Sequence, residues 1–112
     1  LELARASGLG LEIVAGAVPI LGEAREMAAM GLVPLGSHAN RGFCERSLII
    51  EGAADAILLD LLADAQTSGG MLMGLDPDRV DPALAGLRAR GLAPAVIGRA
   101  GVGPAGSLSL RF

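Results

Sequence analysis

The sequence predicts a single domain of the α/β or α+β class, in which helices cover a mixed β-sheet. Its 112 residues fit one domain of ordinary size. Short apolar or β-branched runs alternate along the chain with segments of helical apolar spacing, an order typical of sheets covered by helices. The 52% apolar content can build a core, but from aliphatic side chains, because the chain has two Phe and neither Trp nor Tyr.

The first part of the chain is expected to form a short helix, a strand and a longer helix. Leu1–Ser7 has apolar residues on one helical face, and the glycines after it end the helix. Leu11–Val14 contains β-branched side chains after that glycine break, which favours a strand. Leu21–Met30 has acidic residues early and good helix formers later, and Gly31 offers a left-handed cap.

A loop, a second strand and a third helix are expected next. Leu32–Gly42 contains Pro, Gly, Ser and Asn, which predicts a loop. Ser47–Ile50 is an apolar run that predicts a strand. Ala53–Ala63 carries Ile and Leu at helical spacing, which predicts a helix, and Asp64–Gly70 is then a tight polar turn.

The last part is expected to form a buried strand, a helix and two further strands. Met71–Leu75 is an apolar run of the length of a buried strand. Asp81 is the predicted cap of a helix that has Pro at its first position and ends at Gly91. Ala95–Ile97 and Ser107–Phe112 are predicted strands, expected to pair as a hairpin at the sheet edge.

Composition excludes several classes of function. The net charge of −3 and nine scattered basic residues argue against a nucleic-acid partner. The longest charge-free stretch, Met27–Asn40, is shorter than the roughly 20 apolar residues of a membrane span and is interrupted by Gly and Pro. Cys44 has no second cysteine to pair with, and no secretory signal opens the chain. We therefore expect a cytoplasmic protein without membrane or nucleic-acid contacts.

Few side chains offer chemistry of their own. His38 and Cys44 are the only residues of their kinds, too few for a zinc site with several such ligands. They could form a nucleophile pair, or be a solvated histidine and a small buried thiol. The chain has no Lys and therefore no phosphate-binding P-loop.

Two polar segments are candidate binding sites. The small residues of Asp64–Gly70 could let successive backbone N–H groups point at an anion, and Thr67 and Ser68 could add hydroxyl donors. Alternatively, the two glycines of this segment only end a helix. Asn40 and Arg41 could hold an anion or a carboxylate, or lie in an ordinary solvated turn.

Together these segments resemble selenophosphate synthetases (selenide, water dikinases). Asp64–Leu72 is similar to that family's Asp-Pro-Gln-Thr-Ser-Gly-Gly-Leu-Leu motif, except that Ala65 stands where the family usually has Pro. Ser7–Ile13 is similar to its Ser-Gly-Val-Gly-Ala-Glu-Ile segment, and Gly36 with Asn40-Arg41 fits its Gly…Asn-Arg loop. Further agreement in order and spacing is found at Val18–Leu21, Gly31–Pro34 and Ala95–Gly98.

The resemblance implies a fold like the C-terminal domain of aminoimidazole ribonucleotide synthetase. It implies a parent enzyme that makes selenophosphate from selenide and ATP, with AMP and phosphate as by-products. In that family ATP and Mg²⁺ are bound mainly by the N-terminal half. The resemblance therefore implies that residues 1–112 are a single, partial C-terminal domain. This domain is expected to bind no cofactor or metal and to have no catalytic residue of its own. The residues expected to face substrate or phosphate are Asn40, Gln66, Thr67, Ser68, Gly69 and Gly70.

The resemblance also implies partners. The N-terminal half of the same protein is the first, and a homodimer is expected where the missing part leaves apolar surface exposed. Two alternatives remain at this point. One is a non-enzymatic ligand-binding or interaction module with the same fold. The other is a related synthetase or hydrogenase maturation factor of the superfamily.

Overall fold

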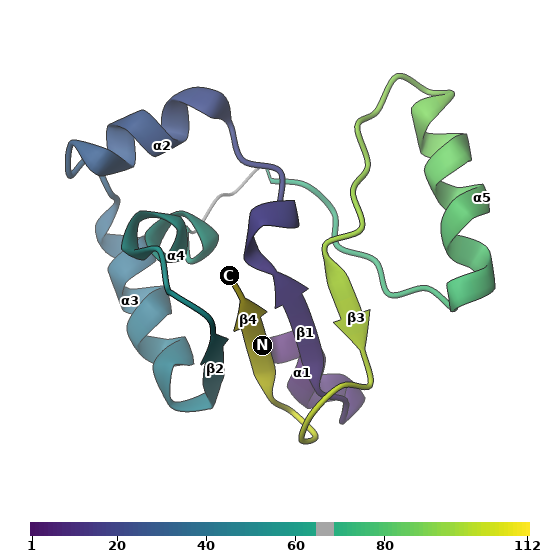
Figure 1. Cartoon of the computed structure of the whole chain (residues 1–112), viewed down its shortest axis with the longest axis horizontal. Coiled ribbons are helices and arrows are strands. Elements are labelled where there is room, and N and C mark those ends of the chain that lie inside the picture. The colour runs from purple at the N-terminus through teal and green to yellow at the C-terminus, as the bar shows by residue number, and fades with distance from the viewer. Residues whose placement is uncertain (65–68) are drawn as a thin grey trace.

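The computed structural model describes residues 1–64 and 69–112, and in them a four-stranded mixed sheet lies beside five α-helices (Figure 1). This confirms the predicted fold class. The helices are α1 (Glu2–Ser7), α2 (Gly22–Ala29), α3 (Leu35–Cys44), α4 (Ala56–Leu62) and α5 (Pro77–Arg88). The strands are β1 (Leu11–Val14), β2 (Leu48–Glu51), β3 (Gly98–Ala100) and β4 (Leu108–Arg111), and short 3₁₀ turns, η1 (Ala15–Ala17) and η2 (Glu45–Ser47), follow β1 and α3.

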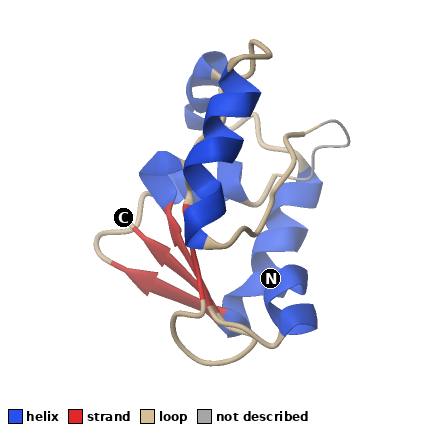
Figure 2. Ribbon diagram, turned by 90° about the vertical axis from the view of Figure 1, so that its right-hand side faces the viewer, coloured by secondary structure: helices blue, strands red, loops and turns tan. Residues whose placement is uncertain are grey.

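The sheet has the strand order β2-β4-β1-β3. The first three strands are parallel, and β3 runs antiparallel to β1 at the edge. Leu11 lies level with Leu108 and Leu48, so these apolar side chains share one face of the sheet. In both views α1 lies against one face of the sheet, behind the strands in Figure 1 and to their right in Figure 2.

The buried interior of the described chain is small. Its apolar members are Ala4 of α1, Ala15 of η1, Leu59 of α4 and Leu110 of β4. Much larger side chains lie exposed on the helices and connections, among them Leu21, Met30, Leu32, Leu35 and Met71. The aliphatic content that predicts a core is therefore partly displayed on the surface.

Several elements confirm their predictions. β1 has the predicted bounds, and α1 ends at Gly8, whose positive φ of 66° is the left-handed cap expected of a glycine. Gly31 and Gly91 follow their helices with φ of 83° and 77°. The predicted helix over Ala53–Ala63 is found as the shorter α4.

The prediction of a loop over Leu32–Gly42 is wrong, because most of this segment is α3. Gly, Ser and Asn have low helix propensity, but propensity is a weak signal that contacts between elements override. Here the polar side chains of α3 bond to α4 rather than to their own backbone, as described below. The helix is therefore specified by its neighbour.

The prediction of a buried strand at Met71–Leu75 is also wrong. The structure has no strand there, and Met71 is exposed. An apolar run becomes a strand only where a neighbouring strand satisfies its backbone groups, and the described sheet places none beside it.

Two predictions in the last part of the chain need correction. α5 begins at Pro77, not Pro82, because Asp76-Pro77 repeats the same cap signal earlier, and Pro82 lies inside the helix. The final strands form no hairpin, since β1 lies between β3 and β4. The strand expected at Ala95–Ile97 begins at Gly98, while Ile97 accepts a backbone hydrogen bond from Val14 (2.8 Å).

Candidate functional site

The end of α4 is held by side chains of α3 at the point where the Asp64–Gly70 segment begins. The Ser37 hydroxyl donates a hydrogen bond to Oδ1 of Asp64 (2.7 Å). The Asn40 side-chain amide donates to the carbonyl oxygen of Ala63 (3.0 Å), the residue that ends α4. The last carbonyls of a helix have no partner further along it, so the Asn40 contact satisfies one of them.

A third contact extends this arrangement along the same two helices. Nη1 of Arg41 lies 2.7 Å from Oδ1 of Asp60, and both side chains are partly buried. Ser37, Asn40 and Arg41 are spaced i, i+3 and i+4, so they share one face of α3. We call the three contacts, Ser37–Asp64, Asn40–Ala63 and Arg41–Asp60, the polar ladder.

The predicted site residues are only partly brought together. Asn40 lies at the end of α4, next to the residue that opens the Asp64–Gly70 segment. Gly69 and Gly70 are exposed, and a Cβ at Gly70 would meet no atom within 4 Å. The remaining predicted site residues lie outside the described part of the chain: Gln66, Thr67 and Ser68.

Sequence reasoning missed Ser37, and it included Asp64 in a candidate segment without identifying its partner on α3. The signal was available in the spacing of Ser37 and Asn40, which places them on one side of a helix. The prediction of a loop concealed it. Arg41 forms an ion pair within the chain, with the carboxylate of Asp60. His38 is exposed and Cys44 half-buried; six residues apart on α3, they lie on different sides of the helix.

The other end of α4 is also fixed. Oδ1 of Asp55 accepts hydrogen bonds from the backbone N–H groups of Ile57 (3.0 Å) and Leu58 (3.1 Å), which makes Asp55 the N-cap. Its other carboxylate oxygen pairs with Arg25 of α2. The hydrogen bond from Arg25, followed by that from the Leu58 N–H, lowers the pKa of Asp55 below its ordinary value.

A shallow cleft of about 320 Å³ lies beside this pair. Its walls are mainly apolar, from η1, the η1–α2 connection and α4, and Arg25 lies at one side. Because η1 directly follows β1, the cleft is at the carboxyl end of a parallel strand, where open α/β sheets commonly bind ligands.

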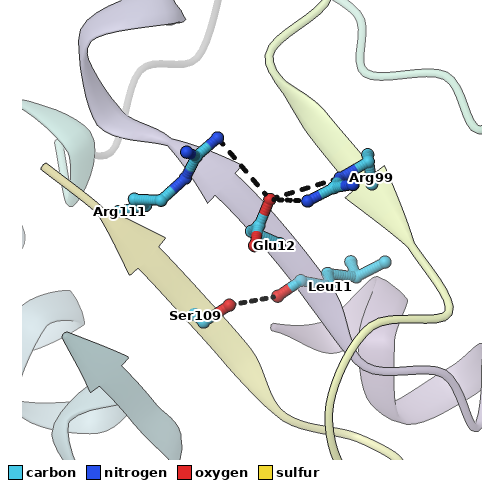
Figure 3. A network of polar contacts seen from close by, with 5 residues as sticks. All are labelled: Leu11, Glu12, Arg99, Ser109 and Arg111. Atoms are coloured by element: carbon cyan, nitrogen blue, oxygen red, sulfur yellow. Dashed lines mark hydrogen bonds and ion pairs between the residues drawn. The ribbon is translucent and has the colours of Figure 1, made fainter. Parts of the chain in front are cut away.

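A second charged cluster lies on the sheet (Figure 3). Oε1 of Glu12 accepts hydrogen bonds from Nη2 (2.8 Å) and Nε (3.3 Å) of Arg99, and Nη2 of Arg111 lies 3.9 Å away. Glu12 is only 7% exposed, and the hydrogen bond from Arg99 is the main cause of its lowered pKa. Ser109 donates to the Leu11 carbonyl nearby (3.4 Å). The cluster joins β1, β3 and β4, so its evident role is to hold the sheet together.

Residues 1–64 and 69–112 contain no group of three or more His, Cys, Asp or Glu side chains that could hold a metal ion. Among the same residues, no helix has the length and apolar character needed to cross a membrane.

Comparisons with known proteins find matches along most of the chain. The C-terminal domain of AIR synthase related proteins matches residues 1–111. A selenide, water dikinase of Nitratidesulfovibrio vulgaris (strain DSM 19637 / Miyazaki F) is 46% identical over 83 residues, which cover 74% of this chain and 24% of that protein. A selenide, water dikinase of Geobacter metallireducens is 39% identical over 97 residues, covering 87% of this chain and 28% of that protein. The chain thus spans about a quarter of the length of these curated relatives.

Proposed function

Because the chain belongs to the AIR synthase related protein family, through the C-terminal domain of that family, we propose that it forms the C-terminal part of a selenide, water dikinase. The observation that carries the proposal is the identity of 46% to such an enzyme across most of the chain. The parent enzyme would make selenophosphate from selenide and ATP, releasing AMP and phosphate. No observation favours the alternative of a non-enzymatic ligand-binding or interaction module.

We propose that ATP and Mg²⁺ are bound outside this chain. The sequence has no Lys to contact phosphates, and the described residues offer no cluster of metal ligands. We therefore assign ATP and Mg²⁺ to the N-terminal half of the parent enzyme, and we propose that this half is the chain's main partner. On this view residues 1–112 carry no catalytic residue.

We propose that the chain contributes anion contacts to the shared site. The segment Gln66-Thr67-Ser68-Gly69-Gly70 offers hydroxyl groups, a side-chain amide and backbone N–H groups, which are suitable donors for phosphate or selenium oxyanions. The exposure of Gly69 and Gly70 supports this role, because their backbone can be approached closely without hindrance from a side chain.

A chimera tests the proposal. Residues 1–111 of this chain replace the matching C-terminal segment of the Nitratidesulfovibrio vulgaris enzyme, and selenide-dependent AMP formation is measured. We expect activity in the chimera and none in the same relative truncated before that segment. A folded chimera without activity would count against the proposal. Mg²⁺-dependent ATP turnover by the pure 112-residue chain would contradict the assignment of ATP to the other half.

A further inference from the structure

One face of the sheet has no helix against it. α1 lies behind the strands in Figure 1 and to their right in Figure 2, and no helix of the described chain lies in front of the strands in the first view or to their left in the second. The strands β2, β4 and β1 are parallel, and parallel sheets are found almost only where both faces are covered. The open face is the one that carries Glu12 (Figures 1 and 3), and it is therefore a candidate surface for a partner.

This open face carries one charged side chain on each of its four strands. Glu12 is the register partner of Arg99, and Glu51 is that of Arg111. Ser109 lies level with Glu12, and Arg111 follows it by two residues, so all four charges share one face. In the strand order β2-β4-β1-β3 the charged residues are Glu51, Arg111, Glu12 and Arg99. Negative and positive charges thus alternate from one edge of the sheet to the other, and we call these four residues the charge row.

Three members of the charge row are accessible to a partner. Glu51 is exposed and forms no ion pair with any described residue. Arg99 and Arg111 approach Glu12 from the two neighbouring strands (Figure 3), but their side chains remain 68% and 53% exposed. The row holds two positive and two negative charges, so it matches neither a uniformly acidic nor a uniformly basic surface. It matches a second row in which the same charges run in the opposite order.

We propose that the open face of the sheet is the docking surface for a second copy of the same chain. A two-fold axis parallel to the strands places β2 of one copy over β3 of the other, and β4 over β1. This rotation reverses the order of the charges, so Glu51 faces Arg99 of the second copy and Arg111 faces its Glu12. Every charge of the row then lies opposite a charge of the other sign, and each contact occurs twice. The proposal does not depend on the proposed function.

The dimensions of the sheet allow these contacts and predict a weak dimer. Stacked sheets lie about 10 Å apart, and Glu51 lies two residues, or about 7 Å, further along the sheet than Arg99. A glutamate and a long arginine side chain that extend from opposite sheets can span this separation. Four strands about 4.8 Å apart form a face of about 19 by 13 Å. This is much less than the roughly 800 Å² that each partner buries in a stable complex, so dimers are expected only at high concentration.

Sedimentation of the 112-residue chain, followed by interference optics, tests the proposal. We expect the mass to rise from 11.2 kDa toward that of a dimer between about 20 and about 500 μM in low salt. Glu51→Arg changes both symmetry-related contacts from attraction to repulsion, and it should raise the dissociation constant at least about tenfold. Glu26→Arg is the matched control, because it makes the same charge change at an exposed position of α2, and it should leave the constant within about twofold. A monomer at the highest concentration, or equal effects of the two substitutions, would overturn the proposal.

The salt dependence separates this dimer from association through the exposed apolar side chains. Contacts between exposed charges are screened by salt, so an increase from about 20 to about 500 mM NaCl should weaken the dimer about tenfold or more. Burial of apolar surface is not weakened in this way. Association that stays the same or becomes tighter in high salt would overturn the proposal.

A charge exchange between two variants tests the pairing itself. Arg99→Glu and Glu51→Arg should each dimerise poorly alone, because each brings like charges together across the two-fold axis. In a mixture of the two, the altered side chains face each other with opposite charge, and the second contact keeps the original pair, so a heterodimer should form. Arg99 also contacts Glu12, so far-ultraviolet circular dichroism first establishes that the variant is folded. If it is not, Arg99→Gln takes its place in the single-variant test and should weaken the dimer in the same direction. Failure of the folded mixture to associate, or unchanged dimerisation of Arg99→Gln, would overturn the proposal.

Discussion

Replacement of Leu59 by alanine is the clearest test of where the small core lies. Leu59 is 6% exposed and lies in the middle of α4, whose two ends are held by Asp55 and the polar ladder. The substitution removes three carbon atoms from the interior, worth about 2.4 kcal/mol at about 0.8 kcal/mol for each buried methylene equivalent. A residual cavity adds to this, and Leu→Ala changes in cores cost about 2–5 kcal/mol. Half-buried neighbours such as Leu58 can partly close the gap, so we expect a loss of about 3 kcal/mol.

Urea unfolding followed by far-ultraviolet circular dichroism measures this loss, because the chain has no Trp or Tyr to report by fluorescence. Leu35→Ala is the control, since Leu35 is 87% exposed and its truncation should change the free energy of unfolding by less than about 0.5 kcal/mol. Should Leu59→Ala prevent folding altogether, Leu59→Met keeps the volume and is expected to cost less than about 1.5 kcal/mol. Equal effects of Leu59→Ala and Leu35→Ala would refute the assignment of the core to α4.

Three other outcomes are expected. Gly98→Ala should lower the stability of the fold strongly, because the added Cβ would lie 1.9 Å from the Glu12 carbonyl oxygen. Gly16→Ala should be tolerated, because no atom lies within 4 Å of its Cβ. Equal urea midpoints of unfolding for the two variants would contradict this prediction. Glu12 and Asp55 have folded-state pKa values below the ordinary 4.5 and 3.8, so the stability that they contribute is present above those values and is lost as the pH falls through the lowered ones. Glu12→Gln and Asp55→Asn should therefore each flatten the fall of the urea midpoint below about pH 4.5. An unchanged slope of urea midpoint against pH would count against these ion pairs. The exposed apolar side chains should cause self-association, visible as mass above 11.2 kDa by light scattering after gel filtration at about 100 μM; a clean monomer there would disprove it.

The elements predicted correctly are those whose cause is local. β1 follows from β-branched residues after a glycine break, and the end of α1 follows from a glycine that can take positive φ. The cap of α4 at Asp55 was not predicted, although its cause is also local, since the carboxylate bonds to N–H groups two and three residues ahead. Such features need no knowledge of the rest of the molecule.

Apart from the start of α5, the elements predicted wrongly depend on partners far along the chain. α3 has unfavourable composition, and its polar side chains bond to residues of α4 and its C-terminal end that lie 19 to 27 positions later in the sequence. The order of β3, β1 and β4 depends on which strand lies between the others, and no local pattern encodes this. The contact between Ser37 and Asp64 follows the same division, because it joins residues that are 27 positions apart in the sequence.

The distribution of apolar side chains links these failures to the proposed function. In the described residues the fully buried apolar side chains are few and two of them are alanines, while leucines and methionines lie on the surface. Met71–Leu75 has the composition of a buried strand and no strand beside it. Large exposed apolar surfaces commonly mark sites of interaction with other protein. These exposed apolar side chains therefore support the proposal that the N-terminal half of a selenide, water dikinase packs against this chain.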